Sequence, residues 1–322
     1  MKLRILTAAD IRVCLPMSGA IEAMRTAFAQ LSSGEAVVPD RIAVSTEEGI
    51  SLFMPGYLPR EGHLAAKVMS VYAGNPSVGL PVIQGVVLVL DSHTGLPVAL
   101  MNGAYLTALR TGAAGGLATE LLAVEDASVL AVFGAGPQAR TQIEAVRAVR
   151  PIREIRLVSR PTEGARILAD ELEGVDVQVF EDPERAVLGA QVIATATDSR
   201  KPVFPGRAIG EGVHVNAIGA FTPEMAEVDG DLISRAKVVV DLRATVMAEA
   251  GDLVQAIEGG AFTLESIHAE LGEVVNGERT GRESPREITL FKSVGNAAQD
   301  VAVAGRILDA AIEQDVGTLL EI

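Results

Sequence analysis

A glycine-rich turn at residues 134–139, Gly-Ala-Gly-Pro-Gln-Ala, follows the apolar run Val129–Phe133 and precedes a helix-forming stretch. In such a motif Gly134 permits the tight turn, and Gly136 lets backbone N–H groups approach a pyrophosphate. A helix beginning near Pro137 would direct its positive end toward that phosphate. An ordinary glycine turn is the alternative, but the strand and helix on either side favour a dinucleotide site. The predicted nucleotide contacts in this turn are Gly134, Ala135, Gly136, Pro137 and Gln138.

The end of the next strand bears on which nucleotide is bound. Glu154–Val158 reads as that strand, and Ser159, Arg160, Pro161 and Thr162 follow it. An Asp or Glu at this position holds the ribose 2′-hydroxyl of NAD, and no carboxylate stands here. Hydroxyls and a guanidinium fork suit a phosphate. Ser159, Arg160 and Thr162 therefore predict NADP(H), with NAD(H) as the alternative.

Three cations of the first 110 residues lie in apolar or glycine-rich surroundings, namely Arg41, Lys67 and Arg110. Lys67 stands between Ala66 and Val68 in a strand-like run, where a cation either reaches water or meets an anion. The three could hold one small carboxylate, because each charge-assisted hydrogen bond contributes roughly 1.5–3 kcal/mol. Their spacing does not decide whether they converge, and solvated surface charges are the alternative.

The elements beyond residue 124 alternate strand, turn and helix, which predicts an α/β domain with a doubly wound parallel sheet of the Rossmann type. Continuous apolar strands such as Val192–Ala196 fit burial on both faces. The other predicted strands are Ser128–Phe133, Glu154–Val158, Asp176–Phe180, His214–Ala217 and Val238–Val240. The predicted helices are Pro137–Val149, Gly164–Leu172 and Pro183–Leu188.

The first part of the chain predicts a different architecture, an α+β domain with a mainly antiparallel sheet, because its strands follow one another without intervening helices. The predicted helices are Pro16–Leu31 and Gly103–Ala123, and the strands are Arg41–Ser45, Ile50–Pro55, His63–Tyr72, Val82–Asp91 and Pro97–Met101. A last helix, Ser293–Ile312, is expected to return to this domain. We thus predict a first domain at 1–123 with 293–322, and a dinucleotide domain at 124–292. The glycines of 112–116 fit either close helix packing or cofactor approach.

Composition narrows the class of partner. The 322 residues carry 27 Lys+Arg against 42 Asp+Glu, a net charge of −15, which disfavours nucleic acid and anionic membranes as partners. Cys14 is the sole cysteine, which excludes an intramolecular disulfide framework and fits a reducing, cytoplasmic location. The sequence contains no uncharged apolar stretch of about 18 residues, which disfavours export and a membrane-spanning helix.

The chain resembles the ornithine cyclodeaminase/μ-crystallin family over nearly its whole length. The resemblance rests on the order and spacing of the glycine turn and of the segments Pro39–Arg41, Ala66–Val68, Gly79–Gly85, Leu106–Gly116 and Thr289–Ala297. It implies that the first domain is a substrate and dimerisation domain, with a homodimer formed through its sheets. It also implies that Arg41, Lys67 and Arg110 act at the catalytic centre, holding a substrate carboxylate beside the nicotinamide. Met54 matches a position in the substrate pocket, and Thr111, Thr195, Ala196, Thr197 and Gly219 match cofactor-side positions.

One departure from the family matters for the chemistry. The cyclodeaminases and alanine dehydrogenases of the family keep an Asp after the fifth Rossmann strand, where it handles the substrate amine. Here Phe221 occupies that position and is predicted to line the substrate pocket. A phenyl ring can neither accept a proton nor pair with an ammonium group. Glu224 and Glu227 follow closely, and we interpret both as surface carboxylates.

These features together predict an NAD(P)H-dependent reductase of a small cyclic 2-imino acid, an oxidoreductase acting on a C–N bond. The family members of the ketimine and pyrroline-2-carboxylate reductase type also lack the Asp, because their substrates arrive with the C=N bond already made. Three alternatives stay open: ornithine cyclodeaminase, alanine dehydrogenase, and an NADPH-binding protein of the μ-crystallin kind without catalysis. Lys67 or water could supply the proton to nitrogen.

Overall fold

A computed structural model describes residues 2–321, which form two units. Unit 1 consists of the described residues up to Arg110 and from Asn296 onward, and unit 2 is Thr111–Gly295. The sequence predicted boundaries after residues 123 and 292 instead. Within these described residues, no helix has the length and apolar character needed to cross a membrane.

Unit 1 is built on a seven-stranded sheet in the order β15-β1-β6-β5-β4-β3-β2. Its neighbours pair antiparallel, apart from the parallel pair β1 and β6. The mainly antiparallel sheet that the sequence predicted is confirmed. The strands are β1 (Lys2–Leu6), β2 (Ile42–Ser45), β3 (Ile50–Leu58), β4 (His63–Val71), β5 (Ile83–Asp91), β6 (Pro97–Asn102) and β15 (Thr318–Glu321).

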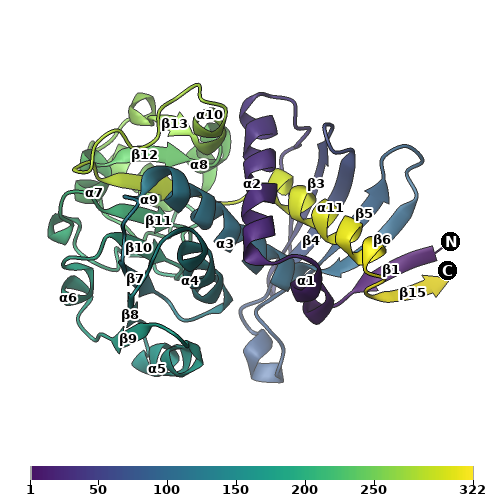
Figure 1. Cartoon of the computed structure of the whole chain (residues 1–322), viewed down its shortest axis with the longest axis horizontal. Helices are drawn as coiled ribbons and strands as arrows, with labels where there is room; N and C mark the ends of the chain where they lie inside the picture. Colours follow the sequence, from purple (N-terminus) through teal and green to yellow (C-terminus); the bar gives the residue numbers. More distant parts are fainter. Residues whose placement is uncertain (1, 322) are drawn as a thin grey trace. The chain divides into compact units, whose positions relative to one another are not determined.

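The helices of unit 1 cover one face of this sheet. Helix α11 (Ala297–Glu313) packs on β3, β4 and β5, and α2 (Met17–Ser32) packs on α11, as Figure 1 shows. Helix α2 buries a stripe at helical spacing that includes Ile21, Met24 and Phe28. The remaining helices of this unit are α1 (Ala8–Cys14), the short η1 (Asn75–Val78) and the first part of α3 (Gly103–Leu122).

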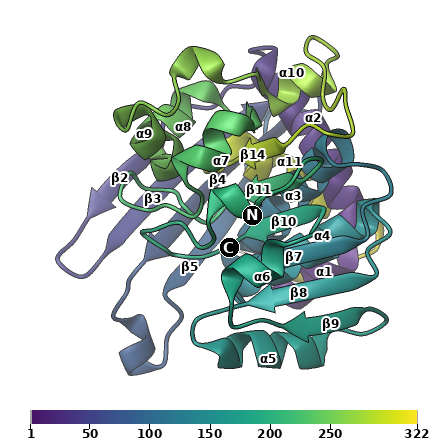
Figure 2. The same ribbon diagram turned by 90° about the vertical axis from the view of Figure 1, so that its left-hand side faces the viewer.

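Unit 2 is built on an eight-stranded parallel sheet in the order β13-β12-β14-β11-β10-β7-β8-β9. Figure 2 shows β7, β8, β10 and β11 of this sheet side by side. The predicted Rossmann architecture is confirmed. The strands are β7 (Val129–Phe133), β8 (Glu154–Val158), β9 (Asp176–Val179), β10 (Val192–Thr195), β11 (His214–Ala217), β12 (Lys237–Val240), β13 (Ala269–Glu270) and β14 (Thr289–Lys292).

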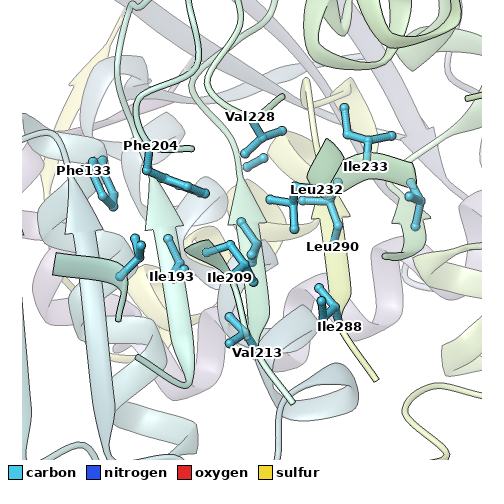
Figure 3. Packing of buried hydrophobic residues seen from close by; sticks show 14 of the residues in the cluster. Phe133, Ile193, Phe204, Ile209, Val213, Val228, Leu232, Ile233, Ile288 and Leu290 are labelled. Carbon is cyan, nitrogen blue, oxygen red and sulfur yellow. The ribbon is translucent and has the colours of Figure 1, made fainter. Parts of the chain in front are cut away.

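Apolar side chains fill both faces of the parallel sheet, because alternate residues of a strand point to opposite faces. Phe133 and Ile193 join one buried cluster, whereas Val132 and Val192 join another. Figure 3 shows the first cluster packed together. The helices of unit 2 are α4 (Pro137–Val149), α5 (Thr162–Glu171), α6 (Pro183–Val187), η2 (Gly206–Ala208), α7 (Gly230–Arg235), α8 (Arg243–Glu249), α9 (Gly251–Glu258), η3 (Leu264–Ser266) and α10 (Leu271–Val275).

Most of α3 belongs to unit 2 because of how its glycines and polar groups are engaged. A Cβ on Gly112 would lie 2.6 Å from Thr141, and one on Gly115 would lie 2.2 Å from Gln142, both on α4. These glycines therefore serve close helix packing, one of the two readings that the sequence left open. This packing also explains why the boundary falls at Arg110, within the helix, rather than after its end.

The predicted C-terminal helix begins later than expected. The structure starts α11 at Ala297, whereas the sequence predicted Ser293. The carboxylate of Asp241 explains the delay, since its Oδ2 accepts hydrogen bonds from Ser293 Oγ and from the N–H groups of Val294 and Gly295. Gly295 has a φ of 78°, which is incompatible with a right-handed helix at that residue.

Candidate functional site

A buried cluster in unit 1 brings two of the predicted cations onto one carboxylate. Lys67, on β4, places its Nζ 2.6 Å from Asp300 Oδ2, and Arg110, on α3, places its Nε 3.1 Å from Asp300 Oδ1. Asp300 lies in the first turn of α11, and Arg110 Nη1 also donates to Gln299 Oε1 at 2.7 Å. The side chains of Lys67 and Asp300 are each only 2% exposed. Their interaction is therefore only weakly screened by solvent.

The electrostatics of this cluster favour an anion. Burial is the largest cause that lowers the pKa of Lys67 to about 8, and the neighbouring charges of Arg110 and Arg41 lower it further. The negative charge of Asp300 opposes these effects. Arg41, directly before β2, thus lies close enough to act on Lys67. Lys67 and Arg110 share the single carboxylate of Asp300, which leaves positive charge in excess within this cluster.

Met54 is the fourth predicted residue of unit 1. It is buried on β3 and faces Lys67 directly in the register of β3 and β4. Because paired residues of neighbouring strands point to the same face of a sheet, its thioether lies beside the Lys67 side chain. The structure therefore groups Arg41, Met54, Lys67 and Arg110 and adds Asp300, which the sequence did not single out.

The glycine turn of unit 2 has the geometry of a phosphate-binding turn. Gly134 has a φ of 109°, and a Cβ there would lie 2.4 Å from the carbonyl oxygen of Ala196. Gly136 is the N-cap of α4, with Pro137 in the first turn and open space where a Cβ would be. The turn lies at the carboxyl end of β7, where the strand order reverses between β7 and β10. Nucleotides bind at this point of doubly wound sheets.

Of the residues that follow β8, Ser159 stabilises the turn and Arg160 faces solvent. Ser159 Oγ donates to the carbonyl oxygen of Pro161 at 2.7 Å and accepts from the N–H of Ala165 at 2.8 Å. Its hydroxyl therefore fixes the turn that leads into α5. Arg160 is exposed, and Thr162 is the first residue of α5. The Ser159 hydroxyl is thus already engaged, whereas the Arg160 side chain faces solvent.

Glu227 is wholly buried and joins the segments that follow β10 and β11. Its Oε1 accepts from the N–H and the hydroxyl of Thr197 at 2.6 and 2.8 Å. Its Oε2 accepts from Thr195 Oγ1 at 2.8 Å and from the N–H groups of Gly219 and Ala220 at 2.6 and 3.3 Å. Three of the predicted cofactor-side residues, Thr195, Thr197 and Gly219, thus have donors engaged by one carboxylate. Ala196, between the two threonines, places its carbonyl against Gly134.

A second buried ion pair, between Lys292 and Asp252, contacts the main chain of Glu227 and of its loop. Asp252, on α9, accepts from the N–H groups of Glu227 and Val228 at 2.5 and 2.9 Å. Lys292, on β14, pairs with Asp252 and donates to the carbonyl oxygen of Ala220 at 2.7 Å. Burial raises the pKa of Glu227, and the charge of Lys292 opposes that rise. The loop at 219–228 is thereby fixed from two sides.

Phe221 is presented by this fixed loop and is 38% exposed. The exposed side chain of Gln255 also holds the loop, because its Nε2 donates to the carbonyl oxygen of Pro223 at 2.9 Å. The other predicted residue of unit 2, Thr111, is buried on α3, and its carbonyl oxygen accepts from Gln142 Nε2 at 2.9 Å.

The prediction that Glu227 is a surface carboxylate is wrong. Its side chain is buried because the donors at the ends of β10 and β11 together replace the water that a carboxylate otherwise needs. Glu224, three residues earlier in the same loop, is exposed as predicted. The sequence signal that distinguishes them is slight, since Met225, Ala226 and Val228 surround Glu227 with apolar residues.

Comparisons with known proteins show the family of the chain. A family model described as ornithine cyclodeaminase/mu-crystallin family matches residues 1–315. A protein of Bacillus cereus named Delta(1)-pyrroline-2-carboxylate reductase is 38% identical over 98% of this chain and 99% of its own length. The structure of the Thermococcus litoralis Delta(1)-pyrroline-2-carboxylate reductase in complex with NADH and L-proline has a TM-score of 0.94 at 38% identity, covering 98% of this chain and 99% of that one. An archaeal alanine dehydrogenase dimer with bound NAD also has a TM-score of 0.94, at 36% identity, covering 100% of both chains.

Proposed function

Because this chain belongs to the ornithine cyclodeaminase/mu-crystallin family, we propose that it is a nicotinamide-dependent reductase that converts a small cyclic 2-imino acid to the L-amino acid. The observation that supports this most is the buried cluster of Lys67, Arg110 and Asp300 with its excess of positive charge. In sequence, Phe221 takes the position at which the family's cyclodeaminases and alanine dehydrogenases keep an Asp that handles the amine. A substrate whose C=N bond already exists requires no such acid.

The cation cluster would bind and orient the substrate. Arg110 and Lys67, aided by Arg41, hold the carboxylate, and each charge-assisted hydrogen bond contributes roughly 1.5–3 kcal/mol. Reduced nicotinamide, when bound, supplies the hydride that the imine carbon accepts. Holding the carboxylate fixes that carbon for attack, and such positioning supplies much of the rate.

Lys67 is also suited to supply the proton that the imine nitrogen gains. With a pKa of about 8 it is protonated at neutral pH and yet acidic enough to transfer its proton. The balance of the reaction is then one hydride to carbon and one proton to nitrogen, with oxidised nicotinamide and a lysine amine left behind. The amine regains its proton from water.

The test of the proposed function is reduced-nicotinamide oxidation by the purified protein with pyrroline-2-carboxylate, with piperideine-2-carboxylate, and with pyruvate plus ammonia. In parallel, ornithine is incubated with the protein and NAD, and proline and ammonia are measured. We expect turnover with at least one cyclic imino acid. Turnover only with pyruvate and ammonia would establish an alanine dehydrogenase, and proline with ammonia from ornithine, without net cofactor change, would establish a cyclodeaminase. Tight NADPH binding without any of these reactions would establish a non-catalytic NADPH-binding protein of the μ-crystallin kind.

For the cofactor, we propose a preference for NADP(H) over NAD(H), supported by the exposed Arg160 and by the lack of a carboxylate after β8. The variant Arg160→Ala is expected to raise KM for NADPH by about tenfold, equal to one charge-assisted hydrogen bond, and to leave KM for NADH within about twofold. Steady-state kinetics with both cofactors measure this. An equal change for the two cofactors would exclude Arg160 from recognition of a 2′-phosphate.

For the assembly, we propose a homodimer formed through the sheet face of unit 1 that α11 leaves uncovered. Ile42, Phe53, Val68 and Val86 face one another across four strands, and Ile42 and Phe53 are 61% and 40% exposed. Such a contiguous apolar row is typical of an interface. The variant Phe53→Glu is expected to weaken the dimer by at least about 100-fold in Kd. Sedimentation analysis measures this, and an unchanged molecular mass would contradict it.

A further inference from the structure

Buried polar atoms without hydrogen-bond partners gather at the first turn of α11. Among the residues that the structure describes, these atoms include Oδ1 and Nδ2 of Asn296, Nε2 of Gln299 and Oγ1 of Thr107. Asn296 is only 3% exposed and Gln299 is 0% exposed. Buried polar groups of folded proteins are nearly all hydrogen-bonded, so such a group calls for an explanation.

Asn296 and Gln299 flank Asp300, the carboxylate of the cation cluster, at the start of α11. Asn296 is the N-cap of α11, and Asp300 follows it by four residues, a rise of about 6 Å along a helix. Gln299 already gives its Oε1 to Arg110. Thr107 precedes Arg110 by three residues on α3, which places both on one side of that helix. The unpartnered atoms therefore lie next to the groups proposed to hold the substrate carboxylate.

A second buried asparagine shows what a structural role looks like in this protein. Asn216 of β11 donates through Nδ2 to Thr119 Oγ1 at 2.9 Å and to the carbonyl oxygen of Gly115 at 3.2 Å. Its Oδ1 bonds to His214 Nε2 at 3.1 Å. Burial lowers the pKa of His214 to about 3, so the imidazole is neutral and suits this network. Asn296 makes none of the corresponding bonds through its own amide.

We propose that Asn296 is a substrate-binding residue whose amide oxygen accepts a hydrogen bond from the N–H of the protonated imine. This inference rests on the proposed function. The imine nitrogen gains its one proton before the hydride reaches the carbon, and the protonated imine then carries one N–H beside the carboxylate carbon. Lys67 and Arg110 supply only donors, whereas a neutral amide oxygen supplies an acceptor without competing for Asp300.

The test compares the variants Asn296→Ala and Asn216→Ala with pyrroline-2-carboxylate as substrate. Asn296→Ala is expected to raise KM for the imino acid at least about tenfold and to leave KM for the cofactor within about twofold. Its Tm should not fall, since the removed amide has no protein partner. Asn216→Ala is expected to lower Tm and to leave the imino-acid KM unchanged. The variant Asn296→Ser, a smaller change, should raise KM in the same direction.

The inference is overturned if Asn296→Ala lowers Tm as Asn216→Ala does while the imino-acid KM stays at the wild-type value. Stabilisation by L-proline separates this inference from the proposed function. If the wild type reduces no imino acid yet L-proline raises its Tm and not that of Asn296→Ala, the proposed function fails and the role of Asn296 in ligand binding holds. Equal stabilisation of both proteins by L-proline overturns the role of Asn296.

Discussion

Replacing Lys67 with methionine is expected to reduce kcat/KM for the imino acid by about 1,000-fold. Methionine keeps much of the volume but removes the ammonium group that lies 2.6 Å from Asp300. Breaking a buried ion pair costs about 3–5 kcal/mol, because the remaining charge is left without its partner. The carboxylate of Asp300 would then oppose the substrate carboxylate instead of neutralising the excess of cations. Steady-state kinetics measure the loss, and calorimetric titration of the cofactor checks that its affinity is unchanged.

Lys237→Met is the matched control, since Lys237 also has a largely buried ammonium paired with carboxylates, at 2.7 Å from Glu283 and 2.9 Å from Glu287. We expect it to leave kcat/KM within about twofold, because Lys237 is the first residue of β12 and so lies at the amino end of that strand, whereas nucleotides bind at the carboxyl ends. Retention of kcat/KM within about tenfold in Lys67→Met would contradict the role of Lys67 in binding and proton supply.

The pH profile of the wild type follows from the same residue. Lys67 has a lowered pKa of about 8, so it is charged below that pH and loses its proton as the pH rises through it. Both carboxylate binding and proton supply need the charged form. We therefore expect kcat/KM to be lost on the alkaline side of about pH 8, and this limb to be missing from the residual activity of Lys67→Met.

Replacing Glu227 with glutamine is expected to lower kcat/KM by about 100-fold and the free energy of unfolding by about 3 kcal/mol. All five groups that reach the carboxylate donate hydrogen bonds to it, two from Thr197 and one each from Thr195, Gly219 and Ala220. A glutamine NH₂ would face N–H groups on one side, leaving buried donors unpaired at about 1–3 kcal/mol each. Glu227 is thus a positioning residue for the segments after β10 and β11.

Glu224→Gln provides the control in the same loop, because Glu224 is exposed. We expect no change in activity and less than about 0.5 kcal/mol in stability. Urea denaturation measures the stability of both variants, and steady-state kinetics measure kcat and the KM values for the imino acid and the cofactor. If Glu227→Gln lost stability but kept kcat and both KM values, Glu227 would hold the fold without positioning the site.

Much of the fold could be predicted from the sequence, and the exceptions have physical causes. Glu154–Val158 and Pro137–Val149 were predicted to the residue, because strong apolar periodicity and clear turn residues bound them. Strand β14 was not predicted as a strand, because Thr289–Lys292 is only four residues long and contains two polar residues. It pairs between β11 and β12, a non-local contact that no local pattern encodes.

Site residues could be predicted where the residue type is unusual for its surroundings. The prediction failed where a residue's role depends on partners that are distant in the sequence. Lys67 was identified because a lysine within an apolar strand is unusual. Asp300 was missed because it lies 190 residues from Arg110 and looks like an ordinary acidic residue in the first turn of a helix. Glu227 was misread because its burial depends on donors from two strands that only the folded sheet brings together.

The way in which the Phe221 loop is fastened leaves that position mutable. Glu227, Lys292 and Gln255 hold the loop through main-chain atoms of Gly219, Ala220 and Pro223. The phenyl ring itself is partly exposed. A lineage could therefore exchange this one side chain while the scaffold that displays it stays intact.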